Sequence, residues 1–382
     1  MKNKKIAFVG NLGNSTYWYV KHLRELKIDA WLYIAFKKYD KEGKPIIPLK
    51  QDPRREDPDL KGILPSWVKF FHLYSIKNLF LNFKKEFKQY NLIIAFDSMP
   101  IFLQFCKSPL ISFGTGSNLR EQIFEKGIRA YLLRRGFLKS KMVLFDNIDS
   151  KTLDALGKLG IKKYEWLPDY CSRDNLVKSM KNTKIKDDFL KKFKERLICF
   201  SSSRIDFQQK GTDILIKGFA AFNKENPGVA RILIINWGKD KDKLKELIKN
   251  LGIGDSVTFL PVLFYPDVLK LINGCSIVFG YFYNGSSGIH HFPFCLQEAL
   301  ALGKISISSL DQNAFLKVVG EKPKIFEAFS EEDIKKQLNL VFKNYSDLKK
   351  EFNEETLHWI EKYCSKEFIS SKLIKIIEEY AQ

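Results

Sequence analysis

Short apolar runs alternate with amphipathic helical patterns along this chain, and that alternation restricts the folds open to it. Lys5–Val9 and Leu92–Phe96 are typical of buried strands, whereas Thr16–Leu26 has the 3.6-residue period of a helix. Strands that alternate with helices form parallel sheets covered by helices. The expected fold class is therefore α/β, with ligands bound beyond the carboxyl ends of the strands.

The 382 residues are enough for two such domains, each with its own core. A polar segment around residues 173–190 predicts a linker. We expect an amino-terminal domain over residues 1–172, a second domain over 190–360, and a final helical segment over 361–382. Residues 37–66 are rich in Lys, Asp, Pro and Arg and are expected to form a long loop.

The net charge of +20 is concentrated in the amino-terminal half, because residues 1–175 alone carry +14. Basic aromatic segments occur there at residues 67–74, 80–88 and 128–139. A basic face with apolar side chains suits an anionic membrane surface. A nucleic-acid surface and an ordinary lysine-rich surface are the alternatives, but no nucleic-acid-binding signature accompanies the charge, so we expect no nucleic-acid partner.

No run approaches the roughly 20 apolar residues of a membrane-spanning helix. The six cysteines are scattered without metal-binding spacing, which favours free thiols in a reducing cytoplasm. The expected location is therefore cytoplasmic, peripheral on the inner face of the membrane. The Asp-x-Asp triplets at residues 57–59 and 240–242 lie in Pro- and Lys-rich segments and are not interpreted as a metal motif, so we expect neither a metal nor another cofactor.

Two segments of the second half have the chemistry of a phosphate site. In the first, a strand ends in the loop Ser201–Arg204, and Lys210 and Gly211 open a helix. An arginine can bind two oxygens of a diphosphate, and a lysine adds a mobile charge. In the second, Gly288–Gly303, a loop with two histidines and a proline leads into a short helix, whose first N–H groups are suited to an anion.

Together these segments resemble the carboxyl-terminal half of family-4-like retaining glycosyltransferases (glycosyl transferases group 1). That family has an Arg followed by Lys-Gly, and later Glu-Ala-Met/Leu-Ala-x-Gly; Arg204, Lys210 with Gly211, and Glu298–Gly303 match in order. The resemblance implies the GT-B fold, in which two Rossmann-like domains face each other across a cleft and the last helix, here within residues 361–382, packs back on the amino-terminal domain. It also implies that Arg204 and Lys210 hold the donor diphosphate and that Glu298 binds its ribose.

The predicted site has further members. The catalytic set also includes His290, which stands where the family has its first glutamate, beside the transferred sugar. On the acceptor side, the segment from Gly114 to Glu121 resembles a Gly-Ser-Asp-Leu-Arg-Glu stretch of bacterial relatives, and it supplies Gly116, Ser117 and Arg120. The remaining predicted donor contacts are Gly13, Asn14, Ser203, His291, Phe294, Cys295 and Leu296.

The function implied is retaining transfer of a sugar from a nucleotide-diphosphate donor to a glycan or lipid-linked acceptor, in bacterial surface polysaccharide synthesis. Because His290 replaces a carboxylate, a non-catalytic nucleotide-binding subunit is an alternative. Nucleotide-sugar epimerases and phosphorylases of the same fold are another. A nicotinamide-dependent dehydrogenase is disfavoured, because the loop after the first strand lacks the Gly-x-Gly-x-x-Gly spacing. The sequence does not specify the sugar, the base or the acceptor.

Overall fold

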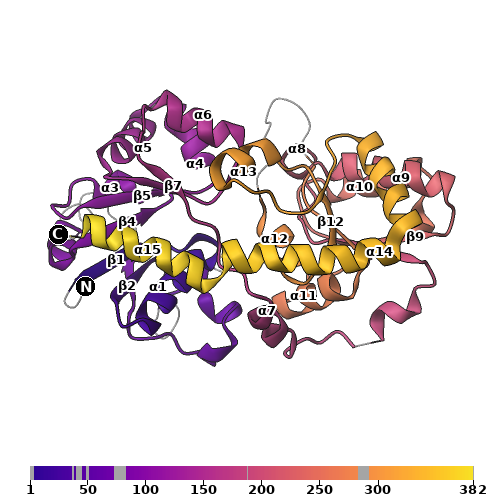
Figure 1. Cartoon of the computed structure of the whole chain (residues 1–382), viewed down its shortest axis with the longest axis horizontal. Coiled ribbons are helices and arrows are strands. Elements are labelled where there is room, and N and C mark those ends of the chain that lie inside the picture. The colour runs from indigo at the N-terminus through magenta and orange to yellow at the C-terminus, as the bar shows by residue number, and fades with distance from the viewer. Residues whose placement is uncertain are drawn as a thin grey trace. The chain divides into compact units, whose positions relative to one another are not determined.

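The structure, a computed structural model, describes residues 4–36, 38–39, 45–48, 51–72, 83–186, 188–282 and 292–381. The chain divides into two compact units (Figure 1). Unit 1 comprises residues 1–147, 151–170 and 363–382, and unit 2 comprises residues 148–150 and 171–362. Each unit is built on one parallel sheet, which confirms the expected α/β class.

The sheet of unit 1 has the strand order β3-β2-β1-β4-β5-β6-β7, and every pairing in it is parallel. The order reverses between β1 and β4. Every residue of β4 and β5 is buried, as expected for strands covered on both faces. The strands are β1 (Lys5–Val9), β2 (Asp29–Phe36), β3 (Val68–His72), β4 (Leu92–Phe96), β5 (Leu110–Gly114), β6 (Val143–Phe145) and β7 (Tyr164–Trp166).

Two helices far apart in the sequence pack together on one face of this sheet. They are α1 (Ser15–Glu25) and α15 (Lys366–Tyr380), drawn in indigo and yellow in Figure 1. Leu373 and Ile377 of α15 are fully buried in the same core as Val20 of α1 and Ile94 of β4. The other helices are α3 (Pro100–Leu103), α4 (Ser117–Arg120), α5 (Ile128–Lys139) and α6 (Ser150–Lys158), of which α6 begins at the unit boundary.

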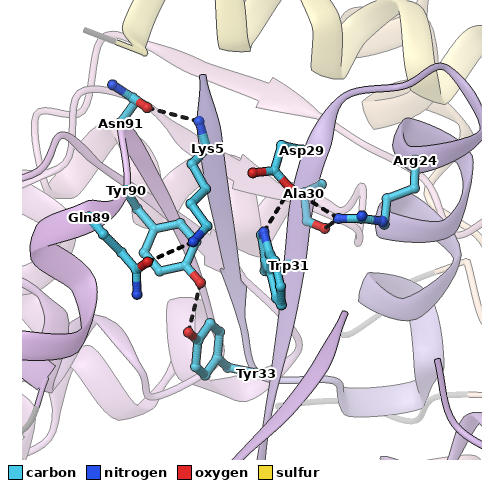
Figure 2. Close-up of polar contacts among 9 residues, drawn as sticks. All are labelled: Lys5, Arg24, Asp29, Ala30, Trp31, Tyr33, Gln89, Tyr90 and Asn91. Carbon is cyan, nitrogen blue, oxygen red and sulfur yellow. Dashed lines mark hydrogen bonds and ion pairs between the residues drawn. The ribbon is translucent and has the colours of Figure 1, made fainter. Parts of the chain in front are cut away.

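Polar contacts tie together the amino ends of the strands in unit 1 (Figure 2). The Lys5 backbone N–H donates to Asn91 Oδ1 at 2.8 Å, and Lys5 Nζ donates to Gln89 Oε1 at 2.6 Å. Trp31 Nε1 donates to Asp29 Oδ1 at 2.8 Å, and Lys5 Nζ lies 4.9 Å from the centre of a Trp31 ring. The amino ends of these strands are therefore occupied by side chains of the protein that are hydrogen-bonded to one another.

The sheet of unit 2 has the order β10-β9-β8-β11-β12-β13, again entirely parallel, and it reverses between β8 and β11. Its strands are β8 (Leu197–Ser201), β9 (Ala230–Ile235), β10 (Val257–Leu260), β11 (Ile277–Phe279), β12 (Ile305–Ser308) and β13 (Phe326–Glu327). The helices are α7 (Arg173–Met180), α8 (Phe207–Lys210), α9 (Thr212–Glu225), α10 (Lys241–Asn250), α11 (Tyr265–Gly274), α12 (Phe294–Ala301), α13 (Gln312–Val319) and α14 (Glu331–Cys364).

One expectation about local structure was wrong. The predicted linker begins with helix α7, which packs against α11, because Leu176 and Met180 supply a small apolar face. The chain therefore passes into unit 2 at residue 171 rather than 190. The basic aromatic segment at 67–74 contains strand β3 at the sheet edge, where aromatic side chains favour extended backbone.

Candidate active site

Arg204 and Lys210, the residues predicted to bind the donor diphosphate, belong to unit 2. They lie where the strand order of its sheet reverses. Ligands of open parallel sheets bind at this position, beyond the carboxyl ends of the strands. The β8 strand ends at Ser201, and the loop that carries Arg204 follows it. The neighbouring β11 strand ends at Phe279, and Tyr281 follows two residues later. Lys210 Nζ lies 3.4 Å from the centre of the Tyr281 ring, so the lysine is held at this reversal point.

Asp206 organises the loop that carries Arg204. Its buried carboxylate caps α8 by accepting from the Gln209 N–H at 2.8 Å. Arg204 Nε lies 3.4 Å and Lys239 Nζ lies 3.2 Å from its two oxygens. The Arg204 guanidinium also donates to Gln209 Oε1. The arginine is therefore oriented before any ligand binds, although about a third of its side chain is still exposed.

Gly211 permits the tight approach between this loop and the chain after β11. Its φ of +59° is left-handed, and a Cβ there would lie 1.3 Å from the Phe282 carbonyl oxygen. The Phe282 N–H donates to the Lys210 carbonyl at 3.0 Å. The Lys-Gly pair thus has a steric requirement for glycine directly after the lysine.

The first turn of α12 lies beside the same loop. The pKa of the Cys295 thiol is raised to about 11, chiefly by burial and also by the Glu298 carboxylate. The Lys210 ammonium and the hydroxyls of Ser202 and Ser203 act in the opposite direction. These effects require proximity, so the structure brings together Ser203, Lys210, Cys295 and Glu298 in one place.

Glu298 is 3% exposed, which is unusual for a helical glutamate and is consistent with a functional position. Pro293 is the N-cap residue of α12. One predicted donor contact of this helix differs from expectation. The Leu296 N–H already donates to the Pro293 carbonyl at 2.9 Å, which leaves Phe294 and Cys295 as the donors at the helix start. Gly303 has φ +66° just after the helix, as expected. His290 and His291 lie outside the described residues.

In unit 1, the loop after β1 contains two predicted donor contacts, Gly13 and Asn14. Gly13 is accessible, whereas Asn14 is buried. Gly13 is exposed and has φ +65°, so a ligand can approach its backbone. Asn14 is 1% exposed: its Oδ1 accepts from Asn11 Nδ2 at 2.9 Å, and its Nδ2 donates to the Asp52 carbonyl at 3.3 Å. Asn14 therefore stabilises the loop through these hydrogen bonds and is not placed to contact the donor.

The predicted acceptor-side residues lie on the carboxyl side of β5. Gly116 has φ +58° and precedes α4, which carries Ser117 and Arg120. Gln122 Nε2 donates to Ser117 Oγ at 3.1 Å. Asp97, which follows β4, adopts a left-handed φ of +56° and accepts from Asn118 Nδ2 at 2.7 Å. A non-glycine residue held in this conformation is frequent at functional sites.

Two carboxylates in the same region were missed. Asp146 follows β6 and Asp169 follows β7 shortly afterwards, so both lie at the carboxyl edge of the sheet. The pKa of Asp146 is raised to about 8, chiefly by burial and also by the Asp169 carboxylate, and Arg120 opposes both effects. The Ser15 hydroxyl donates to Asp169. The available sequence signal was an aspartate directly after one apolar run, at Asp146, and shortly after the next, at Asp169.

Comparison with known proteins agrees with the fold of the two units. Residues 182–359 match the family glycosyl transferases group 1. No curated protein matches the chain. HepE of Anabaena in complex with UDP has a TM-score of 0.71 at 14% identity, over 98% of this chain and 100% of that one.

Two other solved structures are also similar to this chain. Sucrose-phosphate synthase of Thermosynechococcus elongatus has a TM-score of 0.66 at 11% identity, over 98% of this chain and 99% of that one. The apo form of the lipopolysaccharide outer core galactosyltransferase WaaB has a TM-score of 0.62 at 15% identity, over 98% and 99%. The fold and the family match together identify a glycosyltransferase of the GT-B fold, in which residues 182–359 form a glycosyl transferases group 1 region.

Proposed function

We propose that this glycosyltransferase transfers a sugar from a UDP-sugar, with retention of configuration, to a glycan or lipid-linked acceptor of a bacterial surface polysaccharide. One observation carries the donor part of the proposal: Lys210 lies against Tyr281 at the strand-order reversal of unit 2, and Lys210 and Glu298 both act on the Cys295 thiol there. HepE, a structural neighbour, has been solved with UDP and with UDP-glucose. WaaB, described as a lipopolysaccharide galactosyltransferase, supports the acceptor class.

In the proposed reaction, the bond between the anomeric carbon and the diphosphate oxygen breaks, and negative charge develops on the departing UDP. Arg204 and Lys210 stabilise this charge, which is the main electrostatic requirement of such a transfer. The N–H groups of Phe294 and Cys295 contribute from the start of α12. Glu298 accepts hydrogen bonds from the ribose hydroxyls. Two protein cations are proposed to bind the diphosphate, so we expect no requirement for a divalent ion.

We further propose front-face transfer, in which the departing phosphate removes the acceptor proton. The reason is that His290 occupies the position of the family's first glutamate, so no carboxylate stands there to form a covalent intermediate. The acceptor side comprises Gly116, Ser117 and Arg120. Asp146 is added to it, because carboxyl groups at a sheet edge are suited to sugar hydroxyls.

We also propose that unit 1 docks on an anionic membrane through α5. Ile128, Tyr131 and Leu138 of this helix are 78%, 57% and 54% exposed, and Arg129 is exposed among them. Arg135 instead lies over the Phe105 ring at 5.3 Å. Exposed apolar side chains with adjacent cations suit a lipid surface. No helix in the described part of the chain is both long and apolar enough to cross a bilayer.

The donor proposal is tested by a thermal-shift panel of nucleoside diphosphates followed by UDP release from UDP-sugars. A ligand that binds the native state raises its apparent stability, so UDP should give the largest shift. Arg204→Ala should reduce turnover by about 10²-fold or more. Binding of UDP without turnover of any UDP-sugar would instead favour the non-catalytic alternative.

Membrane docking is tested by sedimentation with anionic and neutral vesicles at low and high salt. We expect binding to anionic vesicles only, most of which is lost as salt screens the charges. The triple variant of Arg129, Arg134 and Arg135 to Gln should weaken this binding without changing UDP affinity. Gln substitutions at Lys245 and Lys249 in unit 2 serve as the control. Negligible binding to both kinds of vesicle would indicate a soluble acceptor.

A further inference from the structure

Unit 2 contains a cavity with a volume of about 560 Å³. Lys304 and Arg173 line it, together with Tyr345, Lys349, Lys350 and Asn353. Tyr345, Lys349, Lys350 and Asn353 belong to helix α14, Arg173 begins α7, and Lys304 directly precedes β12. A cavity of this volume is within the range of small-molecule sites in proteins.

The cavity is separate from the donor site. Ser276, which precedes β11, also lines it, so the cavity lies at the amino ends of β11 and β12. The Arg204 loop follows the carboxyl end of β8, which pairs in parallel with β11. The two sites therefore lie at opposite ends of the strands of the same sheet, the cavity at the amino ends and the donor site at the carboxyl ends. Helix α12 extends between them, since Cys295 is in its first turn and Gly303, just past its end, lines the cavity.

Positive charge is not balanced within this cavity. Four of the lining residues are cationic, and none of the lining residues in the described part of the chain is Asp or Glu. Burial lowers the pKa of Lys304, Lys349 and Arg173 lower it further, and the Cys275 thiol opposes them. The cations therefore repel one another in a partly desolvated space, and a bound anion would relieve that repulsion.

We propose that this cavity binds a sugar-sized anion that carries at least two phosphate groups, either free in solution or as the headgroup of a lipid. Arg173 offers a planar fork for one phosphate, and Lys304, Lys349 and Lys350 offer point charges for the other. Tyr345 and the Asn273 and Asn353 amides line the remaining wall, where hydroxyl groups of a sugar find partners. This site is independent of the donor assignment.

The test uses the whole chain with Arg204→Ala and Lys210→Ala in place, so that phosphate binding at the donor site is weakened. Calorimetric titration with fructose 1,6-bisphosphate and with inorganic pyrophosphate should still detect one site. Adding Lys304→Gln and Lys349→Gln should weaken that binding by about tenfold per cation removed. Lys349→Gln with Lys350→Gln changes only exposed residues of α14, so it provides a variant that is expected to fold.

Gln substitutions at Lys245 and Lys249, exposed on α10, are the charge-matched control and should leave the affinity unchanged. No binding by either probe, or equal affinity in the pocket variants and the control, would overturn the proposal. Vesicles containing phosphatidylinositol 4-phosphate distinguish the sources. Loss of binding to these vesicles in the pocket variants indicates a lipid headgroup, whereas bisphosphate binding with unchanged vesicle binding indicates a free ligand.

Discussion

Replacing Lys210 by Met removes the ammonium group but keeps the apolar stem, so the change isolates the charge in the proposed clamp. In the absence of a donor, the variant loses a cation–π contact at 3.4 Å, worth about 0.5–2 kcal/mol, and the fold should persist. During transfer it loses a cation next to the charge that develops on UDP. Removing one such preorganised donor costs about 2.7–4 kcal/mol, so kcat should fall about 10²–10³-fold.

The measurement is UDP release from the UDP-sugar that gives the highest wild-type rate, with kcat and KM determined separately. UDP affinity is measured by calorimetry on the same samples. Lys245→Met removes a comparable charge from an exposed position on α10 and should behave as wild type. A folded Lys210→Met variant with kcat within about threefold of wild type would refute the assignment of Lys210 to the diphosphate.

Three further predictions follow from individual residues. Glu298→Gln should weaken UDP binding by about 1–3 kcal/mol, the value of a hydrogen bond to a charged group, and an unchanged Kd would return Glu298 to a packing role. Gly211→Ala should lower the free energy of unfolding by at least about 2 kcal/mol, measured by urea denaturation, because φ is left-handed and its Cβ would collide with the Phe282 carbonyl. The folded-state pKa of Asp146 is raised to about 8 from an unfolded value near 4, so wild-type stability should fall as pH rises through this interval. Asp146→Asn removes that dependence, and equal Tm-versus-pH slopes in both proteins would contradict it.

The sequence alone predicted the fold class, because the spacing of apolar residues reports directly which backbone geometry buries them. Leu92–Phe96 and the strand before Ser201 were located in this way. The donor residues were also accessible from the sequence, since Arg204, Lys210, Gly211 and Glu298 stand in the order of a known family. Only glycine fits at position 211 without a steric clash. The Lys-Gly motif is therefore explained by the structure and not only by its resemblance to the family.

The tertiary structure decided what depends on residues distant in the sequence. Asn14 and Gly13 are adjacent in a predicted ligand loop, but only the packed structure shows that Asn14 is buried against Asn11 and Asp52. Asp146 and Arg120 interact because parallel strands bring their loops to one edge, which no local pattern encodes. The cavity beside Lys304 forms for the same reason, since α7, the residue before β12 and α14 each contribute cations to it. Local periodicity fixes the elements, whereas long-range packing determines which charges meet.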